Sequence, residues 1–154
     1  MSNNTLEAVF TVLLPMVRFF EGIRLSPYLC SAGVPTIGIG STLYEDGTRV
    51  TLQDPPITAE RAESLLQLTL RRDYLPGVIK ASPILLKYPN RLGAMVDFAY
   101  NAGVPRYRAS TMRKRIDAED WEGAKEQCLR WNKGGGRVLP GLTKRCQARA
   151  ALLG

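Results

Sequence analysis

Glu21, Cys30 and Thr36 are the residues of this sequence whose types and spacing could do chemistry. The glutamate follows an apolar run, and the cysteine and threonine come nine and fifteen residues later in a glycine-rich stretch. The chain of 154 residues contains no histidine, which excludes Ser-His-Asp and Cys-His catalysis and histidine-ligated zinc sites. A glutamate at a helix end beside a cleft suits a general acid, because burial favours its protonated form. The spacing alone favours a simpler role for Glu21, as a helix cap or an ion-pair partner of Arg24.

The elements that must position these three residues are a helix and a small β patch. We expect a short apolar helix over residues 4–14 and a second helix that begins at Pro15, since proline suits a first helical turn. Glu21 then falls near the end of the second helix. The β-branched residues and glycines of residues 33–40 predict a strand with tight turns, and residues 45–51 predict the returning hairpin.

The rest of the chain has helical periodicity and helix-capping residues. Together the patterns predict an α+β protein: one domain over residues 1–154, with a small β-hairpin lobe, a larger all-helical lobe and a cleft between them. The small lobe spans about 20–57, a connecting helix 58–74, and the helical lobe 75–154 plus the N-terminal helix. The expected helices begin at Thr58, at Pro89 (ending at Ala102), after Ser110, at Asp117 (ending at Trp131) and near Pro140.

The basic charge is concentrated in the last third of the sequence. Residues 1–99 hold nine basic and nine acidic side chains, whereas residues 100–154 hold twelve and five, and the net charge is +7. Such a surface implies a polyanionic partner, which could be nucleic acid, anionic lipid or a bacterial cell wall. A basic nucleic-acid-binding module remains an alternative, although no helix-turn-helix signature is present and the β hairpin would have no role in it.

Other classes of function lack their motifs in this sequence. No secretory signal or membrane-spanning run is expected, and three cysteines without metal-ligand spacing suit a reducing compartment. The run Gly134–Arg137 lacks the Lys-Ser/Thr of a P-loop, and the Gly38-x-Gly40 pair lacks the third glycine of a dinucleotide-binding turn. We therefore expect no metal and no cofactor, and a protein that is made in the cytoplasm.

Motifs spread over nearly the whole chain, from about Leu14 onward, carry a family resemblance. They are FEGIRLSPY (20–28), GVPTIGIG (33–40), DFAYNAG (97–103), Ser110-Thr111, and WNKGGGRVLPGL (131–142) followed by Arg145. Together they resemble the phage lysozymes, the endolysin muramidases of glycoside hydrolase family 24. The resemblance implies a two-lobed lysozyme-like fold that hydrolyses, without a cofactor, the β-1,4 bond between N-acetylmuramic acid and N-acetylglucosamine in peptidoglycan.

The same resemblance gives roles to the three opening residues. The family has Glu, then Asp or Cys, then Thr in this register, so Glu21 would be the general acid, while Cys30 and Thr36 would activate or hold water, as in inverting hydrolases. Cysteine departs from the commoner aspartate, because a thiol with a pKa of about 8.5 is a poorer base at neutral pH. Direct attack by Cys30 with retention stays open, as does a role as a small buried hydrophobe. A lytic transglycosylase, which needs one acid only, is the nearer alternative.

The resemblance also suggests substrate contacts at Asn101, Arg137 and Arg145. Asn101 would hydrogen-bond sugar or peptide, although a helix-terminal Asn beside Gly103 is an equal alternative. The two arginines would meet peptide-stem carboxylates, whereas most surface arginines are only solvated. Ser41 stands where the family often has histidine, which predicts a difference in stability rather than in catalysis.

The resemblance further implies where the protein acts. A phage endolysin of this kind is synthesised in the host cytoplasm, is released through a holin pore, and acts as a monomer on peptidoglycan glycan strands in the periplasm. Membrane contact by the N-terminal helix stays open.

Overall fold

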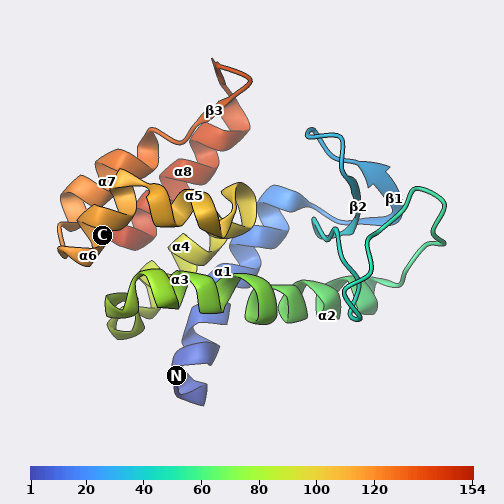
Figure 1. Cartoon of the computed structure of the whole chain (residues 1–154), viewed down its shortest axis with the longest axis horizontal. Helices are drawn as coiled ribbons and strands as arrows, with labels where there is room; N and C mark the ends of the chain where they lie inside the picture. Colours follow the sequence, from blue (N-terminus) through green and yellow to red (C-terminus); the bar gives the residue numbers. More distant parts are fainter. The chain divides into compact units, whose positions relative to one another are not determined.

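The computed structural model describes all of residues 1–154. The protein is mostly helical and contains two short β hairpins (Figure 1). The chain divides into two compact units. Unit 1 comprises Met1–Met16 and Tyr74–Gly154, and unit 2 comprises Val17–Asp73. The α+β prediction is confirmed. The helix expected over 58–74 belongs, up to Asp73, to the same unit as the β hairpin, and the expected cleft stays a prediction.

Helix α1 (Asn3–Glu21) is one continuous helix, so the predicted break at Pro15 is wrong. A proline inside a helix removes one backbone hydrogen bond. That cost is offset by burial on both sides of it, because Val9, Leu13 and Val17 are fully buried at a spacing of four residues. The prediction that Glu21 lies near a helix end is confirmed, because Glu21 is the last residue of α1. None of the helices combines the length and the apolar character that crossing a membrane would require.

A short antiparallel hairpin follows α1 in unit 2. Strand β1 (Arg24–Leu29) pairs with β2 (Pro35–Gly38), with Tyr28 opposite Thr36 and a register shift between Arg24 and Tyr28. The prediction of β2 is confirmed, but its partner is β1 and not residues 48–51. Residues 45–48 form a turn that is closed by a single bridge between Leu43 and Arg49. Strand β1 escaped sequence reasoning because it is mostly exposed and has no apolar alternation.

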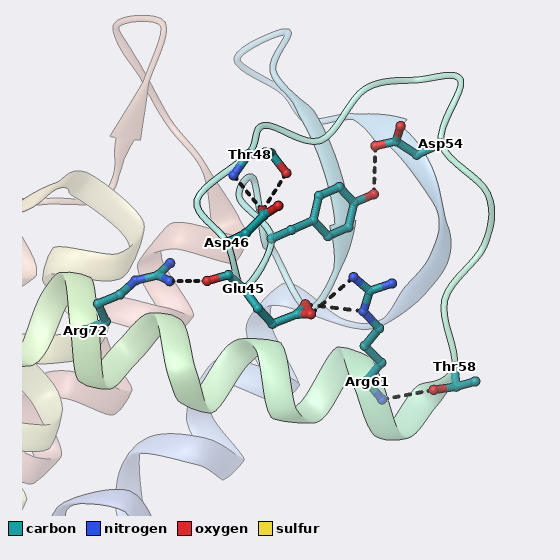
Figure 2. Close-up of polar contacts among 8 residues, drawn as sticks. Glu45, Asp46, Thr48, Asp54, Thr58, Arg61 and Arg72 are labelled. Carbon is teal, nitrogen blue, oxygen red and sulfur yellow. Dashed lines mark hydrogen bonds and ion pairs between the residues drawn. The ribbon is translucent and has the colours of Figure 1, made fainter.

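The loop after β2 is closed by the carboxylate of Asp54. The Tyr44 hydroxyl donates a hydrogen bond of 2.7 Å to Asp54 Oδ2, and Thr51 donates from its backbone N–H at 2.8 Å and from its hydroxyl at 2.7 Å. Figure 2 shows Asp54 within this loop, which continues to Thr58. These bonds lower the pKa of Asp54, the backbone N–H of Thr51 most strongly.

The same loop is attached by two arginines, Arg61 of helix α2 (Ala59–Thr69) and Arg72 of the π-helical turn η1 (Leu70–Tyr74) that follows it. The Arg61 guanidinium donates to both carboxylate oxygens of Glu45 at 3.3 and 3.2 Å, and Arg72 Nη1 donates to the Glu45 carbonyl at 2.8 Å (Figure 2). Thr58 caps the helix as predicted, because its Oγ1 accepts the backbone N–H of Arg61 at 3.1 Å. The loop therefore has a fixed position over α2 within unit 2.

Removal of the Tyr44 hydroxyl tests this loop anchor. Tyr44→Phe should destabilise the protein by about 1 kcal/mol at neutral pH, the net value of one hydrogen bond. Burial, and then the bond to Asp54, raises the pKa of Tyr44 to about 12 from 10.0. Because the pKa of Tyr44 is higher in the folded protein than in the unfolded chain, its hydroxyl contributes fully to the free energy of unfolding below pH 10. This contribution is lost as the pH rises toward 12. Urea unfolding at pH 7, 10 and 12 should show that alkaline loss for the parent and a smaller one for the variant. An equal loss in both would contradict the assignment.

Unit 1 is built around helix α4 (Pro89–Ala102), whose predicted bounds are confirmed. Every residue from Leu92 to Ala99 is buried. Gly93 allows the N-terminal part of α1 to approach, because a Cβ at this position would lie 2.7 Å from Val12 Cγ2. The other elements of the unit are η1 (Leu70–Tyr74, which begins in unit 2), α3 (Leu75–Ala81), η2 (Pro83–Lys87), α5 (Val104–Ala109), α6 (Thr111–Asp117), α7 (Trp121–Leu129), β3 (Lys133–Gly134), β4 (Arg137–Val138) and α8 (Pro140–Leu153).

Among these, the Ser110 cap and the start of α8 at Pro140 are confirmed. The predicted helix over residues 117–131 is shorter, because Asp120 accepts the backbone N–H of Gly123 and begins α7 only at Trp121. The expected loop over 132–136 contains β3 and joins β4 in a second small hairpin.

Candidate active site

The turn between β1 and β2 carries Cys30. The backbone N–H of Cys30 donates to the Val34 carbonyl at 3.1 Å, and Gly33 N–H donates to the Cys30 carbonyl at 2.8 Å. Gly33 has φ +75°, a left-handed conformation that glycine adopts without strain. These bonds fold the turn back on itself and place the half-exposed Cys30 side chain at its start.

Thr36 lies on β2 and is almost completely buried, with 2% of its surface exposed. Its hydroxyl donates a hydrogen bond of 2.8 Å to the Val34 carbonyl. The hydroxyl proton is therefore engaged, and the lone pairs of Oγ1 remain as the acceptors that Thr36 can offer to a neighbouring group.

The thiol of Cys30 has a different electrostatic environment from the other two thiols. The backbone N–H of Val34 first, and then that of Ala32, lower the pKa of Cys30 through hydrogen bonds that favour the thiolate. Burial raises the pKa of Cys128 to about 12 and also raises that of Cys146. Both of these cysteines are fully buried, on α7 and α8. Cys30 is thus the accessible thiol, and the one whose pKa is lowered.

Glu21 belongs to the same unit as Cys30 and Thr36. It is half-buried at the end of α1, and Gly22, with φ +67°, ends the helix through a 2.9 Å bond from its N–H to the Arg18 carbonyl. Burial, and then the negative charge of Glu21, raise the pKa of Tyr28, and Cys30 adds to this effect. Glu21 and Cys30 therefore both lie close enough to Tyr28 to act on its hydroxyl.

Tyr28 was missed by sequence reasoning, although it is in the motif that carries the resemblance. Arg24 lies over its ring, with 4.4 Å between the guanidinium carbon and the ring centroid. Arg24 therefore stacks on Tyr28, and no ion pair between Arg24 and Glu21 is needed to explain its position.

The three expected substrate contacts all lie in unit 1. Asn101 is exposed in the last turn of α4, and Arg137 is exposed on β4 without an ion pair or a side-chain hydrogen bond. Arg145 differs from both, because only 4% of it is exposed and it donates to both oxygens of Asp97 at 2.7 and 3.1 Å. Within unit 1, Arg145 neutralises a buried carboxylate.

Asp97 and Arg149 are buried polar residues that sequence reasoning missed. Arg149 is fully buried, and its Nε donates to Asp97 Oδ2 at 2.6 Å. The signal that could have found this cluster is two polar pairs at a spacing of four, Asp97 with Asn101 and Arg145 with Arg149, on helices that are otherwise apolar at those faces. Ser41, the other departure from the family pattern, is also buried, and its hydroxyl has no hydrogen-bond partner.

Comparison with known proteins decides the family. The family model described as phage lysozyme matches residues 18–149, a range that includes Glu21, Cys30 and Thr36 as well as the buried cluster around Asp97. The chain belongs to the phage lysozyme family. It is therefore a glycoside hydrolase, an endolysin that degrades peptidoglycan in host lysis.

Relatives and solved structures agree with this assignment. The endolysin of Acyrthosiphon pisum secondary endosymbiont phage 1 is 32% identical over 90% of this chain and 92% of its own length. The endolysin of Salmonella phage P22 is 32% identical over 86% of this chain and 89% of its own. The structure of an endolysin from Escherichia coli O157:H7 phage FAHEc1 has a TM-score of 0.78 at 31% identity, over 92% and 90% of the two chains. The lysozyme-like fold prediction is confirmed.

Proposed function

We propose that the chain hydrolyses the β-1,4 bond between N-acetylmuramic acid and N-acetylglucosamine, with Glu21 as general acid and Cys30 with Thr36 activating water. The observation that carries the proposal is the contrast among the thiols. The one cysteine in register with Glu21 and Thr36 is accessible and has a lowered pKa, whereas the pKa of each of the other two is raised. A thiol that only filled space would have the second kind of environment.

In the proposed reaction, Glu21 donates its proton to the glycosidic oxygen as the bond from that oxygen to C1 breaks. A water molecule attacks C1 from the opposite face and gives its proton to the Cys30 thiolate. Thr36 Oγ1 accepts a hydrogen bond from the same water, because its own proton is held by Val34. The products are a reducing sugar and a free hydroxyl, with inversion at C1, and both side chains recover their protonation states from solvent.

Two other mechanisms use the same residues differently. Attack of the Cys30 sulfur on C1 would form a thioglycosidic intermediate and retain configuration. A transglycosylase would use Glu21 alone, and a hydroxyl of the muramic acid would attack to give an anhydro sugar. Mass spectrometry of the digested wall separates these: a reducing end supports hydrolysis and an anhydro end supports transglycosylation. Proton NMR of the first-formed anomer separates inversion from retention.

Substitution of Cys30 tests the proposed base. Cys30→Ala should lower kcat on purified peptidoglycan by about 10²-fold, the lower range of general-base catalysis. Cys30→Asp should keep substantial activity, because a carboxylate with a pKa of about 3.9 accepts a proton at neutral pH. Activity that depends on a deprotonated base is present above the pKa of that base and is lost below it. The acid limb of the kcat/KM profile should therefore move to lower pH in Cys30→Asp.

The two buried cysteines provide the matched control for this prediction. A Cys128→Ser/Cys146→Ser variant keeps only Cys30 and should be inactivated by iodoacetamide as fast as the parent. Bound glycan strands should slow the inactivation. Full activity of Cys30→Ala would remove the thiol from the mechanism and make the transglycosylase the better interpretation.

The surface of unit 1 suits an anionic polymer. Six exposed basic side chains of the last third form no ion pair, namely Arg106, Arg108, Lys114, Lys133, Arg137 and Lys144. We infer that they attract the enzyme to the carboxylates of peptidoglycan, over a range of about 10 Å at 0.1 M salt. The enzyme acts as a monomer in the periplasm after release by a holin. Lysis of cells that express it with and without a co-expressed holin tests that route.

A further inference from the structure

The side-chain amide of Asn101 has a fixed orientation. Arg149 Nη2 lies 3.0 Å from Asn101 Oδ1. A guanidinium has only donors, so the amide atom that faces it must be the oxygen, and this assignment does not depend on telling oxygen from nitrogen. The NH₂ group of Asn101 therefore faces away from Arg149, and no protein group accepts a hydrogen bond from it.

The group that holds Asn101 is itself immobilised. Arg149 is fully buried, its Nε is bonded to Asp97 at 2.6 Å, and its guanidinium carbon lies 5.4 Å from the centre of the Phe98 ring. Asp97 in turn is held by the two bonds from Arg145. A buried guanidinium with two fixed partners cannot rotate to free the Asn101 oxygen without breaking a charged hydrogen bond.

An unrestrained surface asparagine can turn over and offer either its oxygen or its NH₂ group to a ligand. The exposed Asn101 lacks this freedom, because a reversed amide would point its NH₂ group at the donors of Arg149. Its outward face is therefore a pair of N–H donors, and the complementary group is a hydrogen-bond acceptor.

We propose that Arg149 is a positioning residue that makes Asn101 a donor-only contact, so that Asn101 selects a carbonyl or carboxylate oxygen of the substrate. This inference rests on the proposed function and on the expectation from the family resemblance that Asn101 hydrogen-bonds sugar or peptide. Peptidoglycan offers such oxygens from two sources, the acetamido groups of the sugars and the peptide stem. The shared chemistry is the acceptor oxygen, and the substrate used in the test distinguishes the source.

The test compares Asn101→Ala with Asn101→Asp on soluble glycan strands. Alanine removes the donor, and KM should rise about fivefold to tenfold with kcat nearly unchanged, as expected for the loss of one hydrogen bond. Aspartate keeps one oxygen on Arg149 and turns a second acceptor outward, so its KM should rise further. Its melting temperature should equal or exceed that of Asn101→Ala, because it gains a charged partner. If Asn101 had a purely structural role, the variant with the lower melting temperature would also have the higher KM.

Three comparisons complete the experiment. Asn90→Asp adds the same charge at an exposed position of the same helix and should leave KM unchanged. Strands stripped of peptide stems should abolish the Asn101 effect if the acceptor is in the stem and retain it if the acceptor is an acetamido group. Arg149→Lys should raise KM in the parent but not in Asn101→Ala, because the effect passes through the amide.

The outcomes distinguish this inference from the proposed function. If the parent cleaves the strands and Asn101→Asp binds as well as or better than Asn101→Ala, the donor-only contact is refuted while the hydrolase stands. An Arg149→Lys effect that persists in Asn101→Ala refutes the positioning role. If Arg149→Lys does not fold, the comparison of Asn101→Ala with Asn101→Asp still decides whether Asn101 is a donor-only contact. If the parent enzyme leaves the β-1,4 bond between N-acetylmuramic acid and N-acetylglucosamine intact, the proposed function itself is refuted.

Discussion

Glu21→Gln should lower kcat/KM on peptidoglycan by about 10³-fold, within the range that general acid catalysis supplies. Glutamine keeps the size of the side chain and its hydrogen-bonding atoms but cannot transfer a proton to the leaving oxygen. The glycosidic bond would then have to break with an alkoxide as the leaving group. Because substrate contacts are retained, the loss should be in kcat, with KM nearly unchanged.

The same substitution should leave the melting temperature equal or slightly higher. Glu21 is the last residue of α1, where its carboxylate meets the negative end of the helix dipole. Release of reducing ends from purified walls, together with calorimetry, measures both effects. Glu7→Gln is the control, because it removes the charge of an exposed glutamate on the same helix, and it should keep full activity. Near-parental turnover by Glu21→Gln would refute its role as the acid.

Asp97→Ala should have the largest effect on stability, a loss of about 3–5 kcal/mol. Asp97 is fully buried and accepts hydrogen bonds from Arg145 and Arg149, so its removal leaves two buried guanidinium groups without their common counter-charge. For a chain of this size the melting temperature should fall on the order of 10 °C.

The control for Asp97→Ala is the same substitution at an exposed ion pair. Asp117 lies 2.8 Å from Arg113, and both side chains are about one-third exposed. Asp117→Ala should cost about 0.2–1 kcal/mol, because solvent screens the pair. Urea unfolding at pH 7 compares the two variants. Similar losses would mean that the buried cluster contributes no more than a surface pair.

The local signals in the sequence predicted α4, α6 and α8 of unit 1 and the ends of several elements, but not the short helices α3 and α5. Thr58 and Ser110 cap their helices, and α4 has its expected bounds, because capping side chains and a 3.6-residue period act over one or two turns. Glu21 at a helix end and Thr36 on a strand were likewise predictable from neighbouring glycines and prolines.

Other features depend on partners that are distant in the sequence. The continuity of α1 through Pro15 depends on tertiary burial rather than on local propensity, because Leu13 and Val17 on either side of the proline are both fully buried. The Asp97 cluster joins positions about fifty residues apart, and Arg149 shows its role only once α4 and α8 pack together. The resemblance supplied the register of Cys30, but only the folded turn gives its thiol the backbone donors.

The division of the chain into its two units has a consequence for synthesis on the ribosome. Unit 2 is one uninterrupted stretch, residues 17–73, and can fold as soon as it has left the exit tunnel. Unit 1 is interrupted: its first sixteen residues are made first, yet Val9 and Leu13 belong with a core whose remaining helices are made last. That apolar segment must wait exposed until residues 74–154 emerge, because closure of so long a loop precedes any contact that stabilises it. The N-terminal segment is therefore an apolar stretch whose partners in the core are the last part of the chain to be made.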